Sequence, residues 1–235
     1  MFCRLISRPP VAAVVLALCP ISAAWAAGMQ PETTVVLIHA GDGEGSLNVR
    51  NSDPQAALLH TVLEDLPEDT AELLIVTPPV ARVEAGKSQL VRFILQPTEP
   101  IETQRMKRVI FEGIAPKNPD GSSRVNITVR HGLPVIIHPQ GMPVKRDPWT
   151  QLQWSVEGGQ LVGHNPSPYV VRLANQVMLL PGKQTIGLPS TYILPSQRIT
   201  QPLPPGVPVV SAVRVYPASL YGFAVAPYEA ALQPH

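Results

Sequence analysis

The chain has 235 residues, and its 18 Lys and Arg balance 17 Asp and Glu to give a formal net charge of +1. This balance excludes a strong electrostatic attraction to nucleic acid or to a membrane surface. A hydrophobic share of 45% is too high for a disordered chain, and 28 prolines are too many for a helical bundle, because proline breaks helix interiors. The composition therefore favours a compact, β-rich protein.

Residues 1–26 have the pattern of a secretory signal peptide. Arg4 and Arg8 give a positive start, residues 11–21 are apolar, and small residues end the segment at Ala26. The apolar run is short for a membrane-spanning helix, which needs about 20 residues, so a retained anchor is the less favoured alternative. Cleavage after Ala26 would remove both cysteines and leave an exported chain that no disulfide holds together.

Short apolar or alternating runs, separated by turn residues, fill the first half of the chain. They predict strands over residues 33–38, 46–50, 73–76, 89–96 and 109–111. The glycine-rich segment 41–45 predicts a hairpin turn, because it has neither the spacing of a dinucleotide fingerprint nor enough carboxylates for calcium. Frequent turns between short strands favour a sandwich or barrel. Residues 56–66 disagree, since their leucines have helical spacing and taken alone predict a helix.

An alternating run from Val125 to His138 is the most informative segment. At about 3.3 Å per residue it would span roughly 46 Å, more than twice the length of a typical strand. Pro134 favours an edge position, because proline cannot donate to a central ladder. We therefore predict a strand that extends beyond its own sheet and offers an edge to another molecule. The alternative is that its apolar side chains only cover the protein's own core.

Residues 140–148 are rich in proline and form a predicted hinge between residues 27–139 and residues 149–235. Each part has about the 100 residues of an immunoglobulin-like sandwich. In the second part the pattern predicts strands over residues 153–156, 169–173, 177–180, 213–216 and 222–226.

Two ordered motifs resemble the PapD-like family of periplasmic pilus-assembly chaperones: TPPVARVEAGKSQLVRF at residues 77–93 and NPSPYVVRL at residues 165–173. EGIAP at residues 112–116 and VIIHP at residues 135–139 resemble strand ends of the same family. The resemblance implies an all-β fold of two immunoglobulin-like domains set at an angle, with a cleft between them. It also makes residues 56–66 a strand, because tertiary context overrides local periodicity.

The resemblance further implies a chaperone that binds pilus or fimbrial subunits in the periplasm and delivers them to an outer-membrane usher. Such a chaperone donates an alternating strand to the unfinished sandwich of the subunit, which is donor-strand complementation. The matching donor residues here are Val125, Ile127, Val129 and Leu133. Apolar residues at every second position suit this task, because side chains on one face of a strand recur with a period of two.

The family also holds the subunit's terminal carboxylate with two cations in the cleft. The matching positions here are Thr34 and Pro134, and neither can carry a charge. Candidate replacements, chosen because they lie nearby in the sequence, are Arg130, Arg108 and His131. The alternative for each of them is a solvated surface charge.

Arg92 matches a family arginine beside the interdomain contact, where we expect a structural ion pair. The six histidines are scattered and no G-x-S-x-G motif occurs, so we expect no enzymatic activity, no cofactor and no metal. A secreted fimbrial subunit or adhesin is the main alternative, but it would need a longer alternating extension than residues 27–33. A carbohydrate-binding sandwich would favour exposed aromatics, and after residue 26 only Trp149 and Trp154 are tryptophans.

Overall fold

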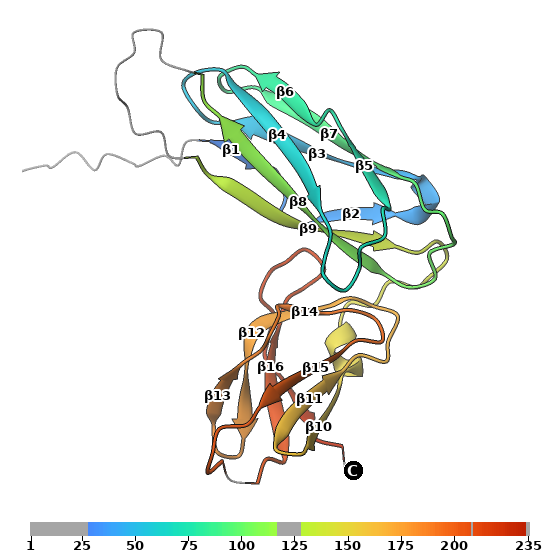
Figure 1. The fold of residues 1–235 in the computed structure, drawn as a ribbon, viewed down its shortest axis with the longest axis vertical. Helices are drawn as coiled ribbons and strands as arrows, with labels where there is room; N and C mark the ends of the chain where they lie inside the picture. Colours follow the sequence, from blue (N-terminus) through green and yellow to red (C-terminus); the bar gives the residue numbers. More distant parts are fainter. Residues whose placement is uncertain (1–27, 117–127, 208, 234–235) are drawn as a thin grey trace, which may run out of the picture.

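The computed structural model describes residues 28–116, 128–207 and 209–233, and the regular secondary structure of this part is almost entirely β-strand (Figure 1). The first domain contains β1 (Met29–Pro31), β2 (Val36–His39), β3 (Glu44–Asn51), β4 (Ala57–Glu64), β5 (Leu74–Thr77), β6 (Val80–Val83), β7 (Ser88–Leu95), β8 (Arg105–Ile114) and β9 (Arg130–His138). A short 3₁₀ helix, η1 (Ala40–Asp42), follows β2.

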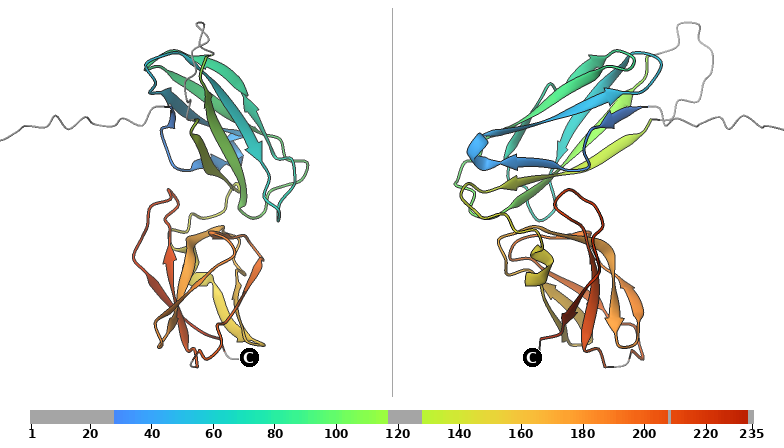
Figure 2. Two further views of the ribbon diagram at one scale, coloured as in Figure 1. Left: turned by 60° about the vertical axis from the view of Figure 1, so that its left-hand side comes forward. Right: turned by 180° about the vertical axis from the view of Figure 1, so that it is seen from behind.

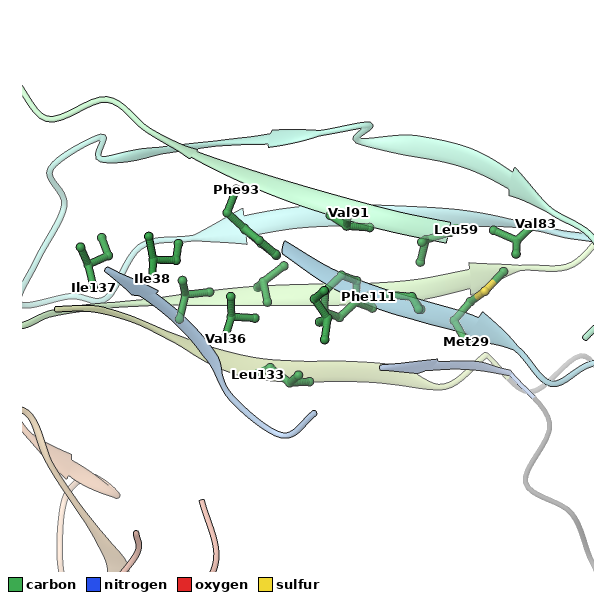
Figure 3. Close-up of a cluster of buried hydrophobic side chains, with 14 of the residues drawn as sticks. Met29, Val36, Ile38, Leu59, Val83, Val91, Phe93, Phe111, Leu133 and Ile137 are labelled. Carbon is green, nitrogen blue, oxygen red and sulfur yellow. The ribbon is translucent and has the colours of Figure 1, made fainter. Parts of the chain in front are cut away.

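The first domain is a sandwich of two sheets, with strand orders β1-β3-β7-β5 and β2-β9-β8-β4-β6. Alternation along the strands fills the space between them, because every second side chain points inward. Phe93 of β7 and Phe111 of β8 are fully buried and belong to one cluster of hydrophobic side chains (Figure 3). Val135 and Ile137 of β9 belong to the same cluster.

The second domain begins with the 3₁₀ helix η2 (Pro148–Gln151). Its strands are β10 (Gln153–Glu157), β11 (Gln160–His164), β12 (Val171–Leu180), β13 (Gln184–Gly187), β14 (Tyr192–Ile193), β15 (Arg198–Pro202), β16 (Ala212–Pro217) and β17 (Tyr228–Ala231). One sheet has the order β10-β11-β15 and the other β13-β12-β16-β17, with β14 beside β12. Trp154 is 1% exposed and is the largest side chain of this domain's core.

The two domains meet end to end at an angle (Figures 1 and 2). A separate apolar cluster lies at their contact, with Met106 and Ile136 from the first domain and Val170 and Tyr192 from the second. Gln104 adds polar contacts, because its side-chain oxygen accepts a hydrogen bond from the Val170 amide at 2.8 Å. The expected fold of two sandwiches at an angle is therefore confirmed.

Residues 56–66 contain a strand, which confirms the expectation from the resemblance and not the helix that their leucine spacing predicts. β4 pairs with β6 on one side and β8 on the other, which fixes it as an extended chain. Leu59 lies in the core while its neighbour Leu58 is 42% exposed. Pairing on both edges thus outweighs a leucine spacing that an isolated helix would favour.

Three sequence expectations are wrong in detail. Segment 41–45 does not close a hairpin: β2 pairs with β9 in one sheet and β3 with β7 in the other, so the turn carries the chain between sheets. Gly43 makes this possible with a left-handed φ of 71°. The runs 169–173 and 177–180 form the single strand β12, which has an irregularity between Leu173 and Val177. Residues 222–226 form a loop with an isolated bridge, and the last strand is β17.

Candidate functional site

The first half of β9 forms an open sheet edge. β8 pairs with β9 over residues 130–137, but β2 pairs only with residues 135–138. Residues 130–134 therefore have one strand neighbour among the strands that the structure describes, and their other edge is free of ladder partners. Such an edge is a template for pairing with another chain. Pro134 lies on this open stretch, which agrees with the edge position expected for it.

The side chains of β9 show which face continues beyond the domain. Leu133 and Ile137 are buried in the core of the first domain (Figure 3), and Val135 belongs to the same cluster. Val129 has the same parity, yet it is 41% exposed and precedes the strand, which begins at Arg130. The face of β9 that covers the core therefore continues, at Val129, to an apolar side chain that lies outside that core.

The remaining predicted donor residues divide in two ways. Val125 and Ile127 lie outside the described residues. Leu133 is only 7% exposed and packs within the first domain, so its assignment as a donor residue is corrected. The reason is that Leu133 shares the inward face of β9 with Val135 and Ile137, so its side chain packs between the two sheets.

The three candidate cations do not converge on one place. Arg130 is 58% exposed, and its Nε lies 3.6 Å from Glu112 Oε2, as a solvated surface pair would. His131 lines a depression of about 470 Å³ with Thr34. Arg108 instead lines a pocket of about 340 Å³ that Pro134 also borders. Of the three, Arg108 alone therefore shares a pocket with Pro134, one of the two uncharged positions, and His131 lies beside the other.

Sequence reasoning assigned no role to Arg172, which lines the same pocket as Arg108 but from the second domain. Its neighbours Val171 and Leu173 are buried in the second-domain core, so the intervening side chain points to the opposite face of β12. Its Nη1 atom is buried without a hydrogen-bond partner among the described residues. Burial lowers the pKa of this guanidinium, although an arginine stays charged in proteins. The sequence signal that could have identified Arg172 is that it is the one charged residue in the apolar stretch VVRL, which follows NPSPY.

Arg92 forms an ion pair with Glu44, so the expected ion pair exists. It links β7 to β3 within the first domain, and both side chains are about half exposed. No hydrogen bond or ion pair joins Arg92 to the second domain within the described ranges. The expected placement at the interdomain contact is therefore corrected.

The described residues contain no cluster of His, Cys, Asp and Glu that could hold a metal ion. The same residues include no helix long and apolar enough to cross a membrane. What the geometry offers is an open strand edge, an exposed apolar residue in line with it, and a cationic pocket where that edge ends.

Comparisons with known proteins agree on one family. Residues 28–143 match the family model described as pili and flagellar-assembly chaperone, PapD N-terminal domain, and residues 147–226 match the PapD C-terminal domain. An uncharacterized fimbrial chaperone of Escherichia coli K12, YhcA, is 46% identical over 199 residues, covering 84% of this chain and 88% of the relative. The chaperone protein caf1M of Yersinia pestis is 24% identical and covers 73% of each chain.

Solved structures show the same fold. The Salmonella enterica SafA pilin–SafB chaperone complex contains a chain that matches with a TM-score of 0.72 at 20% identity, covering 89% of this chain and 99% of that one. The E. coli chaperone DraB matches with a TM-score of 0.70 at 20% identity, covering 88% and 99%. With both domain models matched in order, the chain belongs to the PapD family of pilus-assembly chaperones.

Proposed function

We propose that this chaperone works in the periplasm, where it binds pilus subunits through the segment that leads into β9 and delivers them to an outer-membrane usher. The observation that carries the proposal is the open edge of residues 130–134, continued by the exposed Val129 in the core-facing register. A relative of the same fold was solved with a pilin bound, and the matched curated relatives are chaperones. These findings favour a chaperone over the alternative of a structural subunit or adhesin.

The donor residues in this proposal are Val125, Ile127 and Val129. A subunit whose sandwich lacks one strand exposes a groove between two strand edges, and an added strand pairs with those edges through its backbone. The period of two then sends all three side chains into the groove. Burying each of them contributes about 1.5–3 kcal/mol, so the set supplies a large part of a stable complex.

The remaining assignments fit this function. Residues 1–26 would direct export and lie outside the described residues. Residues 27–139 would donate the strand, residues 140–148 would act as the hinge, and residues 149–235 would close the other side of the cleft. The structure supports this division, because β9 ends at His138 and η2 begins at Pro148.

The test is the double variant Ile127→Asp/Val129→Asp, co-expressed with a pilus subunit from the same genome. Losing two buried apolar side chains removes about 3–6 kcal/mol, so we expect capture to fall at least a hundredfold. The melting temperature should stay unchanged, because Val129 is already exposed.

The matched control is Ile75→Asp/Leu90→Asp. These two residues are 47% and 45% exposed and lie on β5 and β7, in the other sheet of the same domain. The control should keep normal capture. Wild-type yields of subunit with the β9 double variant would refute the donor assignment.

A further inference from the structure

The pocket between the domains is lined from both sides. Arg108 and Pro134 contribute from the first domain, and Arg172, Thr191 and Tyr192 from the second. Its volume is about 340 Å³, which suits the end of an extended chain and not a folded domain. Two arginines line it, and no acidic residue is among its described lining.

Arg172 differs from most arginines of the described chain. Arg82, Arg92, Arg105, Arg130, Arg198 and Arg214 each lie within ion-pair distance of a carboxylate. Arg172 has no such carboxylate among the described residues, and its Nη1 is both buried and without an acceptor there. Arg172 as a whole is half-buried, and a charge in such a place without a partner is unfavourable, so a ligand of opposite charge would complete it.

The surroundings hold this guanidinium in place without neutralising it. Gly222 lies so close that a Cβ there would be 3.2 Å from Arg172 Nη1, and its φ of 84° suits glycine. The loop that contains Gly222 extends towards the first domain (Figure 2). There Thr34 Oγ1 donates a hydrogen bond to the Tyr221 carbonyl at 2.6 Å. Glu68 lies beside the pocket, where it accepts hydrogen bonds from the lining residue Tyr192 at 3.0 Å and from Gln197 at 3.1 Å, and within the described residues it makes no ion pair with Arg172.

The open edge of β9 leads into this pocket. A strand added along residues 130–134 must stop where β2 begins to pair, at Val135. Gly132 and Pro134, on that open stretch, both line the pocket. The end of an added strand would therefore lie at the margin of this pocket. Arg108 comes from β8, on the other side of β9, but its side chain lies over Gly132, where a Cβ would be 3.7 Å from Arg108 Cδ. A cationic pocket favours the carboxyl end of that strand over the amino end, which sets the strand parallel to β9.

We propose that Arg172, together with Arg108, binds the terminal carboxylate of the subunit, so that the second domain supplies the charge that Thr34 and Pro134 lack. This inference rests on the proposed function and adds to it the residues that anchor the guest chain. A guanidinium is forked, so the part of Arg172 that lines the pocket can donate to a carboxylate while Nη1 stays under the loop at Gly222. Arg108 supplies a second positive charge from the first-domain wall of the pocket.

The test compares Arg172→Gln with the control Arg214→Gln, using a subunit from the same genome in its native form and with Gly-Ser-Gly added at its C-terminus. Arg214 lies in the same domain and pairs with Glu229. We expect Arg172→Gln to capture the native subunit about ten- to a hundredfold more weakly, because a charge-assisted hydrogen bond is lost. Arg214→Gln should match the wild type. The extended subunit should bind the wild type and Arg172→Gln equally weakly, because its carboxylate is displaced.

The outcomes separate this inference from the proposed function. Wild-type capture by Arg172→Gln, with capture lost in the β9 double variant, overturns the anchor and leaves the donor strand standing. An Arg172→Gln defect that is equally large with the extended subunit also overturns the anchor. Capture that survives in both variants refutes the proposed function itself.

Two measurements need no subunit. The melting temperature of Arg172→Gln should equal or exceed that of the wild type, because an unpaired buried charge is removed; a fall would overturn the proposal. In protein labelled with ¹⁵N-arginine, the Arg172 Nε–H resonance should shift with N-acetyl-valyl-tyrosine as the free acid and stay in place with its amide. Equal shifts with inorganic phosphate at the same concentration would overturn the assignment to a chain terminus.

Discussion

Asn165, the first residue of the NPSPY motif, joins two loops at the top of the second domain. It is fully buried, and its Nδ2 lies 2.7 Å from the Tyr169 carbonyl oxygen, 3.0 Å from that of Ile193 and 3.1 Å from that of Leu194. Its Oδ1 accepts hydrogen bonds from the amide and hydroxyl of Ser167. The motif thus satisfies buried backbone groups next to the interdomain contact.

The isosteric change Asn165→Asp keeps the shape and removes both N–H donors. The three carbonyl oxygens would then face a carboxylate oxygen. Each buried group left unsatisfied costs about 1–3 kcal/mol, so two lost donors lower the free energy of unfolding by about 2–6 kcal/mol, centred near 4. That is a large share of the roughly 5–15 kcal/mol typical of a domain.

Tryptophan fluorescence during urea unfolding at pH 7 measures this loss of unfolding free energy in the second domain. Both tryptophans of the described chain, Trp149 and Trp154, lie in the second domain, and Trp154 is in its core. With a urea slope of about 1–3 kcal/mol per molar, a loss of about 4 kcal/mol moves the unfolding midpoint down by about 1–4 M. The control Asn175→Asp lies on an exposed part of β12 and should change the free energy of unfolding by less than about 0.5 kcal/mol.

The pH dependence gives a second check. Burial raises the folded-state pKa of the carboxyl that Asn165→Asp introduces above its value in the unfolded chain. A raised folded-state pKa means that stability is regained as the pH falls and lost as it rises. The gap between variant and wild type should therefore narrow from pH 7 towards pH 5. A midpoint that moves no more than the control's, or a gap independent of pH, would refute this account of the motif.

Two further changes test other parts of the structure by thermal unfolding. Burial opposes ionisation of Asp69, but hydrogen bonds and charges from Arg105 and Lys107 outweigh it and lower the Asp69 pKa. The gap in melting temperature between wild type and Asp69→Asn should therefore be full above the ordinary value of 3.8 and close as the pH falls through the lowered pKa; a constant gap contradicts this. A Cβ on Gly163 would lie 2.8 Å from Trp154, so Gly163→Ala should lower the free energy of unfolding by about 1–3 kcal/mol. The control Gly187→Ala, where a Cβ would have nothing nearer than 3.9 Å, should leave it unchanged. Equal effects of the two changes would contradict tight packing at Trp154.

Strand positions were largely predictable, because the period of two is a local property of the chain. The runs that became β3 and β7 alternate clearly, and their observed bounds lie close to those expected. Which strands pair with each other is not a local property, and the errors of the sequence predictions concern this pairing. The turn chemistry of residues 41–45 identified a reversal, yet nothing in it could say that β2 and β3 join different sheets.

The site was predictable only as far as it lies on one strand. Val129 and the open edge follow from the alternation and from Pro134. The point at which this face of the strand leaves the core, between Leu133 and Val129, depends instead on non-local packing between the sheets. Arg130 is a candidate anchor because it lies near Pro134 in the sequence, but its neighbour in space is Glu112. Proximity along the chain is a poor guide to charge in a cleft, because the second wall of a cleft comes from another domain.

An anchor that includes Arg172 would make subunit capture depend on how the two domains are oriented. An anchor on the first domain alone would be independent of the second domain's position. An anchor divided between Arg108 and Arg172 is complete only when the two domains hold their relative orientation. The contacts that set this orientation, Gln104 with the Val170 amide and Thr34 with the Tyr221 carbonyl, then become part of subunit capture. Thr34, where the family resemblance leads us to expect a cation, would thus still serve the anchor, because it holds the loop next to Arg172.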